Sequence, residues 1–171
     1  PLPALARGLR GNPFPDLAAL AAYAALALAF TYPLLANLSS EIDARFGGAE
    51  ARTVLTTLEW QRFAFVHAPD EFFAGNVLHG SGGALFTSDL LLGALPVYAV
   101  LRVAFAPILA FNLLAIAAFL LNAGLMYLAV FSILRQRPAA FLAGLIFAFA
   151  PLPLQHALHP ALNFAWWLPL T

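Results

Sequence analysis

The spacing of the charged residues constrains this chain more than any other feature of its sequence. Eight Arg and eight Asp or Glu residues leave three long stretches without a formal charge: 24 residues at 17–40, 32 residues at 103–134 and 34 residues at 138–171. A helix needs about 20 apolar residues to cross a bilayer. Each stretch is therefore long enough for one membrane span.

The amino-acid composition is typical of a chain that lies mainly in a lipid bilayer. Hydrophobic residues make up 63% of it and charged residues 9%, whereas a soluble domain carries about 25% charged residues. The net charge is zero and Cys is absent, so we expect no nucleic-acid partner and exclude thiolate chemistry. Because the chain starts at Pro1 rather than Met, we expect it to be a piece of a longer protein.

Prolines divide the uncharged stretches, because a proline removes a backbone donor and ends or kinks a helix. Pro151, Pro153 and Pro160 interrupt the last stretch in this way. We therefore expect an all-α, polytopic transmembrane helical bundle. Its predicted parts are spans at about 17–38, 107–134 and 138–154, and the start of a further helix at about 160–171.

The segment at about 39–106 is predicted to be a large extracytoplasmic first loop. Residues 41–89 hold seven of the eight acids but three of the eight Arg, so this part of the loop is acidic. Helical spacing within it predicts an amphipathic surface helix at 50–66. Its apolar face would carry Ala51, Val54, Leu55, Leu58, Arg62, Phe65 and Val66, and its other faces Thr53, Thr56, Thr57, Glu59 and Gln61.

A short helix at 89–105 is predicted to be interfacial or re-entrant. Only 12 uncharged residues separate Asp89 from Arg102, which is short for a crossing. Positive residues favour the cytoplasmic side, and a helix that does not cross places Arg10 and Arg135 together on that side. In the rival topology this helix crosses, and Arg135 lies outside.

Glu50 and Asp43 are the candidate catalytic residues. Glu50 would lie in the first turn of the surface helix, near the end of the first span, where a carboxylate can act as a general base. It can equally be an acid that stabilises a helix N-terminus. Asp43 is the fallback, either as the base or as a solvated loop charge.

Four further residues are candidates for substrate binding. Asp89 opens the short helix, where an acid close to hydrocarbon needs a capping role or a partner. Asn76 lies in a glycine-rich stretch that can offer N–H groups to a phosphate or be a plain surface loop. His156 and His159 can share a metal, bind a phosphate, or simply be interfacial. No third ligand accompanies them, so no metal site is assigned, although a divalent metal stays compatible.

The order of these features resembles the GT-C superfamily of polytopic membrane glycosyltransferases, and more narrowly its bacterial members. The resemblance covers nearly the whole chain from about residue 30. In chain order its motifs include Gly48-Ala49-Glu50, Leu58-Glu59-Trp60, Phe73-Ala74-Gly75-Asn76, Thr87-Ser88-Asp89-Leu90-Leu91, Phe111-Asn112-Leu113, and His156 and His159 ahead of Trp167-Leu168-Pro169.

The resemblance implies an inverting transferase of the inner membrane that uses a polyprenyl-phosphate-linked sugar as donor. An acid of the first outside loop would activate the acceptor hydroxyl, and Glu50 stands where such relatives usually carry Asp. The alternative is a non-catalytic polytopic protein, such as a transporter or a cell-envelope assembly factor. Transporters usually place ionisable residues within their spans; the predicted spans carry none, which favours the transferase.

Overall fold

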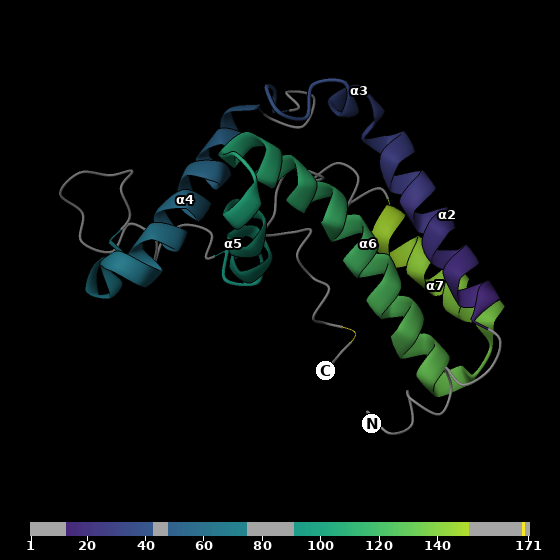
Figure 1. Ribbon diagram of the computed structural model, residues 1–171. Coiled ribbons are helices and arrows are strands. Elements are labelled where there is room, and N and C mark those ends of the chain that lie inside the picture. The colour runs from purple at the N-terminus through teal and green to yellow at the C-terminus, as the bar shows by residue number, and fades with distance from the viewer. Residues whose placement is uncertain (1–12, 43–47, 75–90, 151–168, 170–171) are drawn as a thin grey trace.

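The computed structural model describes residues 13–42, 48–74, 91–150 and 169. All the regular secondary-structure elements in these ranges are α-helices or 3-10 helices, which confirms the all-α prediction for this part of the chain (Figure 1). In chain order they are α2 (Phe14–Phe30), α3 (Tyr32–Leu35), α4 (Gly48–His67), the 3-10 helix η2 (Pro69–Glu71), α5 (Leu95–Ala104), α6 (Pro107–Leu134) and α7 (Arg137–Phe149).

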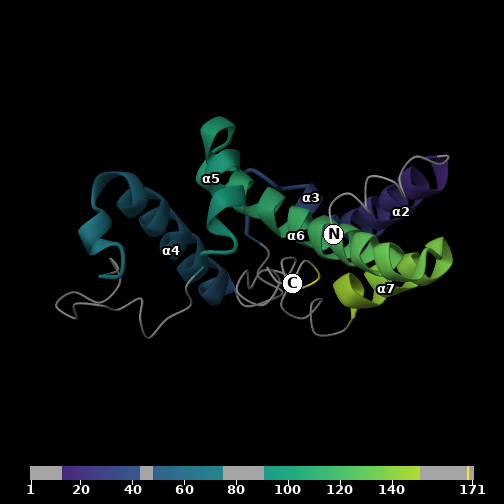
Figure 2. The same ribbon diagram turned by 90° about the horizontal axis from the view of Figure 1, so that it is seen from below.

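Helices α2, α6 and α7 pack against one another along their lengths (Figures 1 and 2). The turn between α6 and α7 contains Arg135, whose φ of 57° places it in the left-handed region and whose N–H donates to the Phe131 carbonyl. A left-handed residue of this kind ends a helix, and Pro138 suits the first turn of the next one. The turn therefore folds α7 back along α6.

A close contact between all three helices requires a glycine at position 144. A Cβ on Gly144 would lie 2.6 Å from the Ala123 carbonyl oxygen and closer still to the Tyr23 hydroxyl. Tyr23 is completely buried, donates its hydroxyl to the Phe141 carbonyl at 2.8 Å and stacks on the Phe141 ring. Because such an interior is close-packed, the space for a methyl group at this crossing is already filled.

The carboxylate of Asp16 joins the three helices at one end of the bundle. Its Oδ1 accepts hydrogen bonds from the Tyr127 hydroxyl at 2.5 Å and from Arg137 Nε at 2.9 Å, and its Oδ2 accepts from Arg137 Nη2 at 3.2 Å. A two-point contact between guanidinium and carboxylate is both strong and directional. The start of α2, the end of α6 and the start of α7 therefore lie together.

At the opposite end, Asn112 fixes the segment that follows α3. Asn112 is buried in α6, and its Nδ2 donates to the carbonyl oxygens of Leu38 at 2.7 Å and of Glu41 at 2.8 Å. Both partners are carbonyl groups of the segment that follows α3. The chain thus leaves the bundle beside the first turns of α6, the helix to which it returns at Pro107.

Helices α4 and α5 form an arm beside the bundle. Both views show α4 diverging from α6 and pointing away from α2 and α7 (Figures 1 and 2). The N-terminal half of α4 buries Ala51, Val54 and Leu58 in one cluster with Tyr98 of α5 and Phe111 of α6. The predicted surface helix at 50–66 is confirmed as a helix, with bounds Gly48–His67.

In the C-terminal half of α4, the residues that the protein buries differ from those assigned to the apolar face. Gln61, assigned to another face, is completely buried, whereas Phe65 and Val66 are 70% and 68% exposed. The reason is tertiary: Ala64 packs against a cluster with Phe72 and Leu95, so the covered face lies one residue earlier than the spacing indicated. Periodicity identifies residues that share a face, but not which face a neighbour covers.

Two predicted spans are shorter than expected. The span at 17–38 is interrupted at Thr31, because Pro33 has no N–H to continue the helix. The span at 138–154 ends at Phe149, where Ala150 is extended as the residue before a proline tends to be.

The other two predicted helices in the described ranges are both present as helices. The segment predicted as a span at about 107–134 is helical over Pro107–Leu134, and α5 begins at Leu95, later than the predicted 89. Within the described ranges α6 is the one helix that is long and apolar enough to cross a membrane unaided, with shorter apolar helices at Phe14–Phe30, Leu95–Ala104 and Arg137–Phe149.

The outside of the three-helix bundle is apolar as well as its inside. Five large side chains on the outer surface are between 43% and 77% exposed: Leu17, Leu28, Ile133, Leu142 and Ile146. A helix in water normally turns a polar face outward, whereas a helix that is apolar all round lies in a core or in lipid. The bundle surface is therefore suited to an apolar environment.

Replacing Gly144 with Ala should destabilise the bundle by about 1–3 kcal/mol, because the methyl group overlaps Tyr23 and Ala123. Gly124→Ala is the matched control: its Cβ would meet only Leu20, at an ordinary 3.6 Å, and Ala is the better helix former. Thermal unfolding in detergent, followed by circular dichroism, measures both. Equal melting temperatures for the two variants would contradict this close contact.

Candidate functional site

Glu50 is the predicted site residue that lies within the described part of the chain. It is exposed in the first turn of α4, directly before Ala51, which is buried against α5 and α6. The partial positive charge at a helix N-terminus favours an acid here. The other predicted site residues, Asp43, Asn76, Asp89, His156 and His159, lie outside the described residues.

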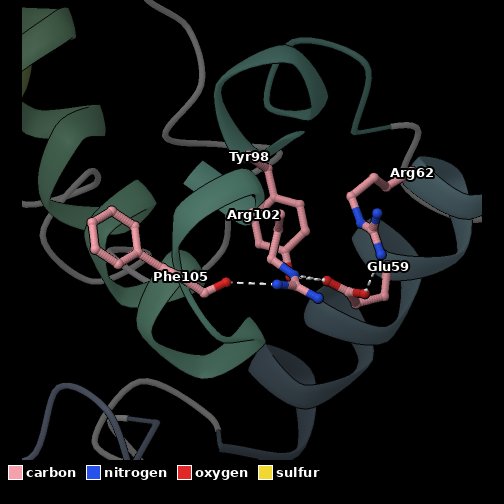
Figure 3. Close-up of polar contacts among 5 residues, drawn as sticks. All are labelled: Glu59, Arg62, Tyr98, Arg102 and Phe105. Carbon is pink, nitrogen blue, oxygen red and sulfur yellow. Dashed lines mark hydrogen bonds and ion pairs between the residues drawn. The ribbon is translucent and has the colours of Figure 1, made fainter. Parts of the chain in front are cut away.

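A second acid of α4, Glu59, is the centre of a polar cluster between α4 and α5 (Figure 3). Its Oε1 accepts hydrogen bonds from the Tyr98 hydroxyl and from Arg102 Nε, both at 2.5 Å, and its Oε2 accepts from Arg62 Nη2 at 3.1 Å. Arg102 Nη1 also donates to the Phe105 carbonyl at 2.6 Å. The cluster thus holds the end of α5 against the middle of α4.

The protonation states of the cluster follow from these contacts. Burial alone would raise the pKa of Glu59, but the hydrogen bonds from Arg102, Tyr98 and Arg62 outweigh it and hold that pKa below its ordinary value. Burial, together with the hydrogen bond to Glu59, raises the pKa of Tyr98. Glu59 is therefore ionised and Tyr98 is a neutral donor at physiological pH.

Glu59 is poorly suited to be a general base. Both of its oxygens already accept hydrogen bonds, and a lowered pKa makes proton uptake unfavourable at neutral pH. Its contacts instead make it the connection that fixes α5 on α4. Glu50 lies nine residues earlier, about 14 Å along the helix, and is separate from this cluster.

Sequence reasoning missed this cluster. Glu59 and Arg62 are three residues apart on one helix, and Tyr98 and Arg102 are four apart on another, so each pair could have been recognised as neighbours. The interpretation instead placed Arg62 on the apolar face of α4 and Glu59 on its polar face. Nothing in the local pattern specifies that residues about 40 positions apart will meet.

No metal centre is found within the described ranges, where no group of three or more His, Asp or Glu side chains could hold an ion. The predicted pair of His156 and His159 lies outside these ranges. No family model matches the sequence, and comparisons with curated proteins and with solved structures give no match either.

Glu59→Gln should lower the free energy of unfolding by about 1–2 kcal/mol at neutral pH, since it weakens charge-assisted hydrogen bonds that are partly exposed to solvent. Because folding lowers the pKa of Glu59, this stability is present above the ordinary value of 4.5 and is lost as the pH falls through the lower value of the folded state.

Thermal unfolding between about pH 3 and about pH 7, which lie on either side of the ordinary carboxyl value, checks this expectation. The difference between wild type and Glu59→Gln should shrink on acidification. Glu71→Gln, at an exposed position of η2, is the control and should leave the stability almost unchanged. A difference that grows toward low pH would contradict the assigned role of Glu59.

Proposed function

We propose that this chain acts in a polytopic membrane glycosyltransferase, which moves a sugar from a polyprenyl-phosphate donor to an extracytoplasmic acceptor. The observation that carries the proposal is the separation of the two ends of the bundle. Asp16, Tyr127 and Arg137 meet at one end. At the other end, Asn112 binds the segment that leaves the bundle after α3. The arm with α4 and Glu50 therefore projects from one end of an apolar bundle.

The apolar outer surface of the bundle supports a membrane location. Helix α6 is long enough to cross alone, and α2 and α7 run beside it with exposed leucines and isoleucines. Shorter helices can lie in a bilayer when neighbouring helices and local thinning compensate for the mismatch. The end that carries Arg135 and Arg137 is proposed to be cytoplasmic, because positive residues favour that side.

Glu50 is proposed as the base that takes the proton from the acceptor hydroxyl. The deprotonated oxygen then attacks the anomeric carbon of the donor sugar, the bond to the polyprenyl phosphate breaks, and the configuration inverts. Glu50 suits this role because it is exposed in the first turn of a helix that is packed against the bundle. Asp43 is the fallback base, and Asp89, Asn76, His156 and His159 are proposed to bind the donor.

The topology predicts which positions a membrane-impermeant thiol reagent can reach in intact cells. The chain has no Cys, so single substitutions give clean signals. We expect Ser40→Cys to be labelled from outside and Gln136→Cys only after the cells are opened, since both positions are exposed and lie at opposite ends of the bundle. Strong outside labelling at 136 would support the rival topology.

Glu50→Gln should abolish sugar transfer in the full-length protein without unfolding it, because the amide keeps its size and hydrogen bonding but cannot accept a proton. Loss of a general base typically costs about a hundred- to ten-thousand-fold in rate. Glu41→Gln is a control in the same loop whose backbone contact to Asn112 is retained. Transfer from a polyprenyl-phosphate sugar donor in proteoliposomes is the measurement.

Other outcomes of this assay have defined meanings. Activity retained in Glu50→Gln but lost in Asp43→Asn would move the base to Asp43. Activity retained in both variants would remove the mechanism. Wild-type protein that binds the donor but transfers no sugar would favour a transporter or assembly factor.

A further inference from the structure

A groove of about 660 Å³ lies between the C-terminal half of α4, η2 and the start of α5. Its walls are almost entirely hydrocarbon and include Phe65, Phe72, Leu95 and Ala99, and Arg62 is the one charged residue that lines it. Its volume lies in the usual range of small-molecule sites, about 300–1,000 Å³. The groove can therefore hold a chain-like apolar ligand with a polar end.

The described part of the chain leaves this groove open. Phe65, Val66 and Leu92 line it and are 70%, 68% and 50% exposed. Adjacent large apolar side chains on a surface mark contact with another apolar phase. Because α4 and α5 are an arm at one end of the proposed membrane bundle, the nearest such phase is the bilayer itself.

Polar groups beside the groove lack an acceptor. Arg62 donates from Nη2 to Glu59, but its Nε is buried without a hydrogen-bond partner. Trp60 packs against the cluster that contains Phe72 and Leu95, and its Nε1 is buried without a partner as well. These two donor atoms are closed off from the groove, but the Arg62 side chain as a whole is 37% exposed, so its other guanidinium N–H groups can donate to a phosphate oxygen.

The charge of the cluster points to the same kind of ligand. Two guanidinium groups, of Arg62 and Arg102, share the single carboxylate of Glu59, which leaves one positive charge in excess. The acids of η2, Asp70 and Glu71, are exposed and do not line the groove. Arginine binds phosphate oxygens well because its donors match their geometry.

We propose that this groove binds one acyl chain of a glycerophospholipid, whose phosphate group contacts Arg62. Arg62 lies twelve residues beyond Glu50, about 18 Å along α4, so this lipid is separate from the sugar donor of the proposed reaction. Its role is to anchor the arm of α4 and α5 to the bilayer. The inference rests on the membrane location within the proposed function and not on the chemistry of Glu50.

Native mass spectrometry of the full-length protein in detergent tests the acyl-chain part. The delipidated protein is mixed with 1-palmitoyl-2-oleoyl-phosphatidylglycerol and the retained lipid is counted. Ala99→Phe fills the groove and should weaken retention by about tenfold or more, equivalent to 1.4 kcal/mol. Val100→Phe, at the next position, which does not line the groove, should retain the lipid as wild type does.

The phosphate contact is tested with a second pair of variants and a second ligand. Arg62→Gln should lose retention, whereas Arg52→Gln, at an exposed position of α4, should not. A diacylglycerol with the same chains but no phosphate should bind more weakly than the phospholipid to wild type and equally weakly to Arg62→Gln. Equal retention of both ligands by wild type would overturn the phosphate contact.

Circular dichroism melting of each variant shows whether it is folded. Unchanged retention by a folded Ala99→Phe variant would overturn the assignment of the groove. Failure of wild type to retain phospholipid would overturn it too, and a lower melting temperature of Ala99→Phe would then indicate that protein covers the groove. Sugar transfer is not measured here, so these results are distinct from those for Glu50.

Discussion

The arrangement of the three apolar helices depends on the carboxylate of Asp16. Helices that are apolar on every side can pack in many rotations and directions, because no solvent-facing side distinguishes one from another. Asp16 selects one arrangement: Tyr127 and Arg137 must both reach it, which sets the ends of α2, α6 and α7 side by side. The tight crossing of Tyr23, Ala123 and Gly144 is compatible with that choice.

The arm depends on the bundle in turn. Asn112 uses both protons of its amide to hold the chain after α3 beside α6, and Ala51, Val54 and Leu58 then bury the first half of α4 against α5 and α6. The second half of α4 is covered at Ala64 by Phe72 and Leu95, and there Glu59 supplies a directional contact to Tyr98 and Arg102. Ion pairs of this kind specify one geometry more than they add stability.

The two acids of α4 illustrate how position divides chemical roles. Glu59 is held by three donors, which lower its pKa and leave no free oxygen for proton transfer. Glu50 begins the same helix at an exposed position, where the proposed reaction needs a carboxylate. Near its C-terminal end, α4 exposes apolar side chains such as Phe65 and Val66. The proposed phospholipid would cover this surface.

The sequence alone determined the helical class and the helix at 107–134, because an uncharged apolar run and the prolines at its borders are local signals. It also located α4 and the prolines from Pro151 onward that interrupt the last stretch, but not the break near Pro33. Only the tertiary structure decided that Gln61 is buried, that Phe65 is exposed, and that Glu59 meets Tyr98 and Arg102. These outcomes depend on which helices meet, and residue spacing within one helix carries no information about its neighbours.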